Sequence, residues 1–145
     1  MIMHKDLIKK IKFFQNKNSH FITFIGPMLK PLRVEKDEYI YQEGDPIEEI
    51  YFLVSGSAAL VHPEYDDAEY IIINEGYYFG EIDFVYLDDD GMNDGKRKFS
   101  VKASEECHLL TLGKLDLYKC DVEFEDYTSE LFSNAMLRLR RTLKK

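Results

Sequence analysis

The middle of the chain, from residue 32 to residue 112, consists of short apolar runs separated by turns that contain glycine. The stretch EIYFLVSGSAALVHP holds two such runs, and the Ser55-Gly56 pair between them is a signal for a β-hairpin. Many short strands with regularly spaced turns predict an antiparallel barrel or sandwich such as a jelly roll. We therefore predict a mainly β protein built on an antiparallel β jelly-roll barrel.

Helical segments are expected on both sides of this barrel. Residues 6–16 and the short segment after them have apolar residues at helical spacing, with Ser19 as the expected N-cap and Gly26-Pro27 as the stop. Helical spacing returns in 114–122 and more clearly in 127–145. The expected organisation is one domain with leading helices in 1–31, a β-roll in 32–112 and C-terminal helices in 113–145.

Charge and cysteine content restrict the class of protein. The formal net charge of −8 argues against nucleic acid as a partner. Cys107 and Cys120 have neither metal nor redox spacing, which is typical of reduced core residues in an intracellular protein. The sequence has no secretory signal pattern and no apolar run of transmembrane length. We therefore expect a cytoplasmic location, which includes the cytoplasmic face of a membrane protein if the chain is one piece of it.

No arrangement of residues indicates catalysis or metal binding. None of the histidines forms a His-x-His pair or stands at ligand spacing from a carboxylate, so surface or packing roles are favoured over a cupin-like metal enzyme. The acidic stretch 88–94 lacks the order of a calcium-binding EF-hand loop, and we interpret it and residues 64–67 as solvated. We expect no metal and no enzymatic activity. The histidines in question are His4, His20, His62 and His108.

The stretch YYFGEIDFV, residues 77–85, suggests an anion site. Gly80 permits a tight turn and a close approach of the backbone to a ligand, and the residues after it can begin a short helix whose free N–H groups attract anions. Further along, alternation places Arg97 on the same side of an expected strand as Phe99 and Val101. An inward-facing arginine needs an anion, which either the protein or a ligand must supply.

The order of features around this stretch is more specific than any one of them. An extended run leads into a Glu43-Gly44-Asp45 turn, followed by IYFLVSGSAALV, then FGE, then an arginine and FSVKA. This order resembles the cyclic nucleotide-binding domain family over nearly the whole chain. IKFFQNKNSHFITFIGPML resembles the leading helical segment of the family, and the last helix resembles its lid. The resemblance implies a phosphate-binding cassette, here in residues 79–99.

The resemblance also implies roles for individual residues. The backbone N–H groups from Gly80 to Asp83 would hold the cyclic phosphate, Glu81 would accept a hydrogen bond from the ribose 2′-hydroxyl, and Arg97 would pair with the phosphate. Arg138 of the lid helix would cap the base of the ligand, which is cAMP or cGMP. The full set of implied ligand-binding residues is Phe79, Gly80, Glu81, Ile82, Asp83, Arg97, Lys98, Phe99 and Arg138.

The sequence departs from the family pattern at this site. Asp83 replaces the small residue usual at the start of the cassette helix, and Lys98 and Phe99 follow Arg97 where small residues are expected. The gap between Glu81 and Arg97 is longer than in most members and contains the acidic insert, and the lid helix is cut off soon after Arg138. These departures give an alternative, in which Asp83 pairs with Arg97 inside a structural or protein-interaction domain that no longer binds nucleotide.

Within the family, the leading segment and the Tyr-Phe strand are most similar to the cytoplasmic domains of voltage-gated and cyclic-nucleotide-regulated channels. The run GPMLKPLRVEKDEYIYQEGDP is similar to ciliate potassium-channel versions. This implies a regulatory domain that couples lid closure to the gate of a cation channel. Its partner would be the membrane-embedded part of the same parent protein, with a homotetramer in the full channel. A kinase regulatory subunit is the other interpretation, disfavoured because such subunits carry two of these domains and an inhibitor segment.

Overall fold

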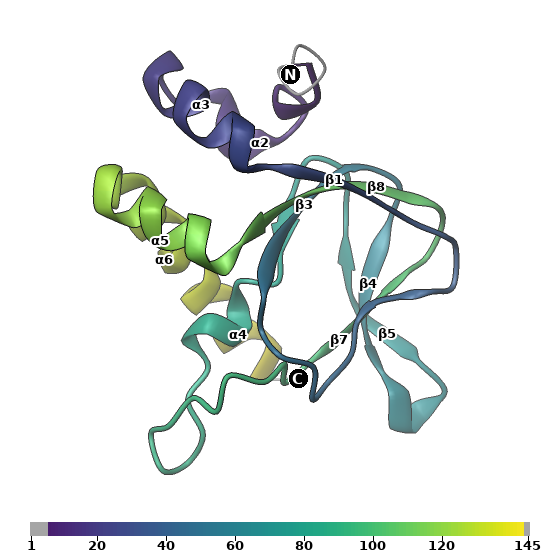
Figure 1. Ribbon diagram of the computed structural model, residues 1–145. Coiled ribbons are helices and arrows are strands. Elements are labelled where there is room, and N and C mark those ends of the chain that lie inside the picture. Colours follow the sequence, from purple (N-terminus) through teal and green to yellow (C-terminus); the bar gives the residue numbers. More distant parts are fainter. Residues whose placement is uncertain (1–5, 144–145) are drawn as a thin grey trace.

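Residues 6–143 are described by the computed structural model, with side chains described as far as Asn134. Within this part of the chain, eight strands form two four-stranded antiparallel sheets, one in the order β1-β8-β3-β6 and the other in the order β2-β7-β4-β5. The fold is the jelly roll with flanking helices that the sequence predicts (Figure 1). The strands are β1 Lys30–Val34, β2 Tyr39–Tyr41, β3 Glu49–Ser55, β4 Ala58–His62, β5 Ala68–Ile73, β6 Tyr78–Phe79, β7 Ser100–Ala103 and β8 Cys107–Gly113.

Two hydrophobic cores hold the structure together, one on each face of the sheet that contains β3. Successive side chains of a strand point to opposite faces, so Leu53 belongs to the core between the sheets, whereas Phe52 and Val54 belong to the core under the helices. Strand β3 is therefore buried on both faces and reads as a continuous apolar run. The chain does turn at Ser55-Gly56 between β3 and β4, but the hairpin prediction is wrong. Strand β3 pairs with β6 and β8, whereas β4 lies in the other sheet and pairs with β5 and β7, so the turn connects the two sheets.

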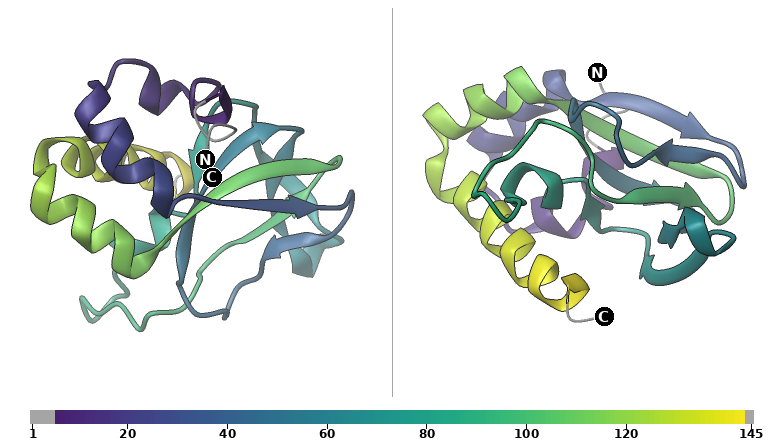
Figure 2. Two further views of the ribbon diagram at one scale, coloured as in Figure 1. Left: turned by 45° about the horizontal axis from the view of Figure 1, so that its top comes forward. Right: turned by 90° about the horizontal axis from the view of Figure 1, so that it is seen from below.

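The helices gather on one side of the barrel and cover the outer face of that sheet (Figures 1 and 2). None of the helices within the described residues is long and apolar enough to cross a membrane. The helical elements are α2 Lys12–Gln15, α3 Ser19–Ile25, the 3₁₀ turns η1 Gly26–Met28 and η2 Pro63–Tyr65, α4 Ile82–Val85, α5 Lys114–Glu123 and α6 Glu125–Leu143.

The leading segment differs from the single helix expected over residues 6–16. Residues 6–8 form one helical turn, and the chain is then extended at Ile11, with φ −93° and ψ 120°, before α2 begins. A tertiary contact accompanies this break, because the Lys12 N–H donates to the Gly76 carbonyl at 2.9 Å. The expected N-cap is also wrong by one residue: Asn18, not Ser19, accepts the hydrogen bond from the Phe21 N–H. The Gly26-Pro27 stop is confirmed, since η1 follows α3 there.

The first strand of the barrel starts at Lys30 and its last strand ends at Gly113. One strand assignment is wrong, because β7 begins only at Ser100 and Arg97 therefore precedes the strand. Arg97 is nevertheless 1% exposed. Its inward direction comes from the loop that holds its backbone rather than from strand alternation.

Candidate functional site

The backbone of Arg97 is fixed by the Glu-Gly-Asp turn that follows β2. The Arg97 N–H donates to the Asp45 carbonyl at 2.7 Å, and the Gly44 N–H donates to the Arg97 carbonyl at 2.8 Å. A bridge between Pro46 and Lys96 adjoins these bonds. The turn and the arginine were separate sequence features, and the fold brings them together.

The guanidinium of Arg97 is held by the ends of two other elements. Nη1 donates to the Gly80 carbonyl at 2.6 Å, and Nη2 donates to the Glu49 carbonyl at 2.6 Å. The Cζ atom lies 4.0 Å from the centre of the Tyr41 ring and 5.8 Å from that of Tyr51, distances at which a cation is attracted to an aromatic face. The cation is therefore positioned without any ligand.

Asp83 supplies the anion for Arg97. Its Oδ2 lies 3.2 Å from Nη1 of Arg97, and the side chains of the two residues are 0% and 1% exposed. Its Oδ1 accepts a hydrogen bond from the Lys98 N–H at 2.8 Å. Burial raises the pKa of the Asp83 carboxyl above its usual value, although the Lys98 N–H and the Arg97 guanidinium both act to lower it. The protein itself therefore supplies the anion that a buried arginine needs, in the form of a buried carboxylate.

Gly80 is required both by its backbone conformation and by its neighbours. Its φ is +91°, in the region that L side chains rarely adopt. A Cβ atom here would lie 3.0 Å from Cδ2 of Tyr51 and 3.4 Å from Nη1 of Arg97. The tight turn that the sequence predicts at this glycine is confirmed, and its close neighbour is the arginine.

The other residues of the expected cassette lie around the same point. Phe79 belongs to the barrel core, with its ring stacked on Tyr51 at 5.3 Å between centroids. Glu81 is fully buried at the N-cap of α4, and Ile82 begins that single helical turn. The structure thus brings Phe79, Gly80, Glu81, Ile82, Asp83 and Arg97 into one buried cluster.

Lys98 and Phe99 lie at the edge of this cluster rather than inside it. The Lys98 Nζ atom forms an ion pair with Asp94 of the acidic insert at 2.8 Å, which holds the pKa of the Asp94 carboxyl below its usual value. Phe99 is half-buried and meets the Tyr86 ring edge to face at 6.1 Å between centroids. The acidic insert therefore satisfies a cation of the expected site.

Asn93, which no sequence motif indicates, attaches the acidic insert to α4. Its Nδ2 donates to the carbonyls of Asp83 and Tyr86 at 2.8 and 3.1 Å, and its Oδ1 accepts from the Gly95 N–H at 2.8 Å. A polar residue in an acidic run carries no signal for such a role. The only available clue was the neighbouring glycine pattern of a turn.

Helix α6 contacts the cassette from outside through residues that no sequence signal indicates. The Tyr78 hydroxyl donates to the Leu131 carbonyl at 3.3 Å and accepts from Nδ2 of Asn134 at 3.1 Å. Phe132 meets Phe84 of α4 edge to face at 6.2 Å. The side chain of Arg138, the expected base-capping residue, lies outside the described residues.

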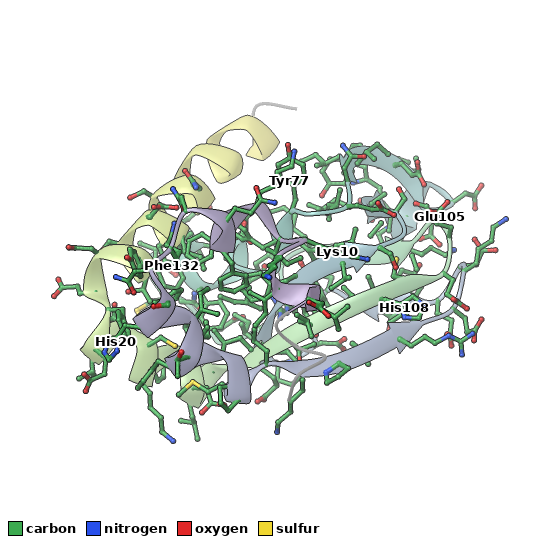
Figure 3. The ribbon with its side chains drawn as sticks, turned by 90° about the horizontal axis from the view of Figure 1, so that it is seen from above. Lys10, His20, Tyr77, Glu105, His108 and Phe132 are labelled. Atoms are coloured by element: carbon green, nitrogen blue, oxygen red, sulfur yellow. The ribbon has the colours of Figure 1, made fainter. Side chains whose placement is uncertain are left out.

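The described histidines are dispersed over the molecule. In the view of Figure 3, His20 lies on the side of the molecule that carries the helices, and His108 lies on the side of the barrel. In the part of the chain that the structure describes, no group of three or more His, Cys, Asp or Glu residues is arranged to hold a metal ion.

The chain is similar in sequence to parts of ion channels and of a kinase regulatory subunit. The chain is 28% identical over 127 residues to a cyclic nucleotide-gated channel cone photoreceptor subunit alpha of Gallus gallus, covering 86% of this chain and 17% of the relative. It is 24% identical over 116 residues to a putative potassium channel protein of Rhodopseudomonas palustris, covering 80% and 26%. It is 27% identical over 115 residues to a cAMP-dependent protein kinase regulatory subunit of Debaryomyces hansenii, covering 78% and 23%. The chain thus spans about a quarter or less of the length of these relatives.

The fold has a solved counterpart. A putative cyclic nucleotide-binding protein from Geobacter metallireducens superposes with a TM-score of 0.73 over 99% of both chains, at 14% sequence identity. At this low sequence identity the superposition shows a shared fold only. The profile of the cyclic nucleotide-binding domain family matches residues 31–120, which include the whole barrel from β2 to β8 and most of α5. The chain therefore belongs to the cyclic nucleotide-binding domain family.

Proposed function

We propose that this domain is a regulatory module that binds a cyclic nucleotide, cAMP or cGMP, in the cassette of residues 79–99 and passes the binding signal to a cation channel. The observation that carries the proposal is the state of Arg97. Its guanidinium is buried and preset by two backbone carbonyls, and its Nε has no hydrogen-bond partner among the described residues. A buried cationic donor without a partner is costly, and an anionic ligand would satisfy it.

The route of the signal follows from the contacts of α6. Leu131 of α6 contacts Tyr78, the residue just before the cassette, and Phe132 of α6 contacts Phe84 of α4. A ligand that shifts α4 would change these contacts and so favour a different position of α6. In the proposed parent channel, with its membrane-embedded part as partner and four copies assembled, this shift acts on the gate from the cytoplasmic side. The channel relatives support this assignment.

Binding is tested by titration calorimetry of the domain with cAMP and, separately, with cGMP. The matched variants are Arg97→Lys, which keeps the charge but loses the planar fork, and Arg33→Lys at an arginine whose side chain is 56% exposed. We expect wild-type binding, at least about tenfold weaker binding in Arg97→Lys, and no change in Arg33→Lys. Equal binding by all three proteins would contradict the proposed role of Arg97.

A second candidate function is favoured by the ion pair between Asp83 and Arg97. In this alternative the pair replaces the ligand, and the domain is a structural or protein-contact module of the same fold. The calorimetry distinguishes the two. Absence of heat with either nucleotide at millimolar concentration, together with a lower melting temperature for Arg97→Lys, supports the alternative and contradicts nucleotide binding by the wild-type chain.

A further inference from the structure

We propose that the Asp83 carboxylate is a built-in competitor of the ligand phosphate, which must leave the Arg97 guanidinium before a nucleotide can bind. This inference rests on the proposed function and deepens it, because it names the residue that sets the affinity of the site.

The contacts of the carboxylate are those that an anionic ligand would need. One oxygen pairs with Nη1 of Arg97 at 3.2 Å, and the other accepts the Lys98 N–H at 2.8 Å. A charged guanidinium and a backbone N–H are both groups that bind phosphate. With both oxygens engaged and the side chain 0% exposed, Asp83 already balances the charge of Arg97 before any ligand arrives.

Removal of the carboxylate leaves the arginine in place. A guanidinium has five N–H donors, and two of the acceptors around Arg97 are backbone carbonyls, at Gly80 and Glu49. These carbonyls hold the cation whether or not Asp83 is present. The Nε donor, without a partner among the described residues, adds to what an incoming anion can gain. The arginine is thus preorganised, and the carboxylate is the movable part.

The position of Asp83 links its release to the rest of the domain. It lies on α4, whose single turn is packed against α6 through Phe84 and Phe132. Its own carbonyl accepts a hydrogen bond from Asn93 of the acidic insert. A displaced Asp83 therefore shifts an element that contacts both α6 and the insert, so that ligand binding and movement of α6 become one event.

The experiment compares Asp83→Asn and Asp83→Ser with wild type by calorimetry, using cAMP and cGMP as probes. Asparagine keeps the shape and removes the charge, and serine is both smaller and uncharged. Asp89→Asn, at an exposed position of the insert, controls for the change in net charge. We expect at least a tenfold lower Kd in both Asp83 variants and less than a twofold change in Asp89→Asn.

The outcomes separate this inference from the proposed function. Tighter binding by the variants supports both. Equal binding by wild type and variants keeps the function and overturns the competitor. Binding by the variants alone supports the competitor and contradicts nucleotide binding by the wild type. Absence of binding in every protein overturns both proposals.

A measurement on the wild type covers the case in which the variants do not fold. The chain is prepared with ¹³C-labelled aspartate carboxyl groups, and the Asp83 resonance is followed by NMR as nucleotide is added to saturation. We expect this resonance to shift as the carboxylate leaves the guanidinium. A resonance that stays in place while nucleotide binds overturns the inference.

Discussion

The ammonium group of Lys17, between α2 and α3, lies 3.1 Å from the carboxylate of Glu130 on α6. The Lys17 side chain is 2% exposed, and its Nζ also lies over the rings of Phe13 and Tyr127, at 4.4 and 5.2 Å from their centres. A cation held between rings from two segments and paired with a carboxylate joins those segments. The leading segment and α6 are therefore expected to move together.

Replacement of Lys17 by methionine tests this link. Methionine keeps the length of the side chain but loses the ion pair and the cation–π contacts, so we expect a loss of about 1 kcal/mol in the free energy of unfolding. Urea denaturation measures it, with Lys9→Met at an exposed position as control. A double-mutant cycle with Glu130→Gln separates the ion pair from the ring contacts. If Lys17→Met lowers the free energy of unfolding no more than Lys9→Met does, the contacts of Lys17 do not stabilise the packing of the leading segment on α6.

Replacement of Gly80 by alanine should destabilise the fold and distort the site. Gly44 provides a matched control, because its φ of +92° is close to the +91° of Gly80, while no other described residue beyond its chain neighbours comes within 4 Å of a Cβ added there. Gly44→Ala should cost about 1–2 kcal/mol through backbone strain alone, and Gly80→Ala should cost more because its Cβ meets Tyr51. Thermal or urea unfolding gives both values. Equal losses would show that the neighbours of Gly80 can move aside.

Replacement of Tyr78 by phenylalanine should loosen α6. The change removes the hydroxyl between the Leu131 carbonyl and Asn134, with an expected loss of about 0.5–1.5 kcal/mol. Hydrogen exchange should become faster in α6 around Leu131. Tyr77→Phe, which removes an exposed hydroxyl bonded to Lys12, is the neighbouring control and should leave α6 unchanged. Unaltered exchange in Tyr78→Phe would argue against this contact as an anchor of the helix.

The raised pKa of Asp83 makes its contribution to stability decrease as pH rises. Between the ordinary aspartate pKa of about 3.9 and the higher value in the fold, the folded state holds a proton that the unfolded state has released. Stability therefore falls with rising pH in that window, and Asp83→Asn removes the fall. In urea denaturation from acid to neutral pH, the free energy of unfolding of Asp83→Asn should increase relative to that of wild type as the pH rises above the ordinary aspartate pKa.

Other carboxylates act in the opposite direction and in a lower window. The pKa of Asp67 is lowered by its hydrogen bonds from Lys102 and Tyr39, and that of Glu106 by its bonds with Arg33 and His108. Their stabilising contributions are present above the unfolded pKa and are lost as pH falls through the lower folded pKa. A difference between Asp83→Asn and wild type that stays constant from acid to neutral pH would contradict the raised pKa of Asp83.

The sequence predicts the fold well because its signals are local. Alternation and the Ser55-Gly56 turn define the strands, and Gly26-Pro27 ends a helix where it should. The break at Ile11 was not predictable from periodicity, since the Lys12 N–H is bonded to Gly76, which lies far along the chain. At that point tertiary contacts override the helical pattern.

The sequence was sufficient to predict which residues form the site, but not all of the contacts that they make. Gly80, Asp83 and Arg97 are recognisable from residue type and order, and pairing between opposite charges was foreseeable as one of two alternatives. The roles of Asn93 and Tyr78 were not, because each depends on which carbonyls of another segment come within reach. Such contacts exist only once the loop and α6 are in place.

The hydrogen bonds of Asn93 divide the insert into two parts that differ in their freedom to change during evolution. On one side, the Asp88 N–H donates to the Met92 carbonyl and closes the tip, and in the part of the chain that the structure describes only the chain neighbours of Gly91 come within 4 Å of a Cβ added there. Residues can be gained or lost in this tip without disturbing the cassette. On the other side, the number of residues from Asn93 to Arg97 is fixed, because both ends are fastened to the same buried cluster.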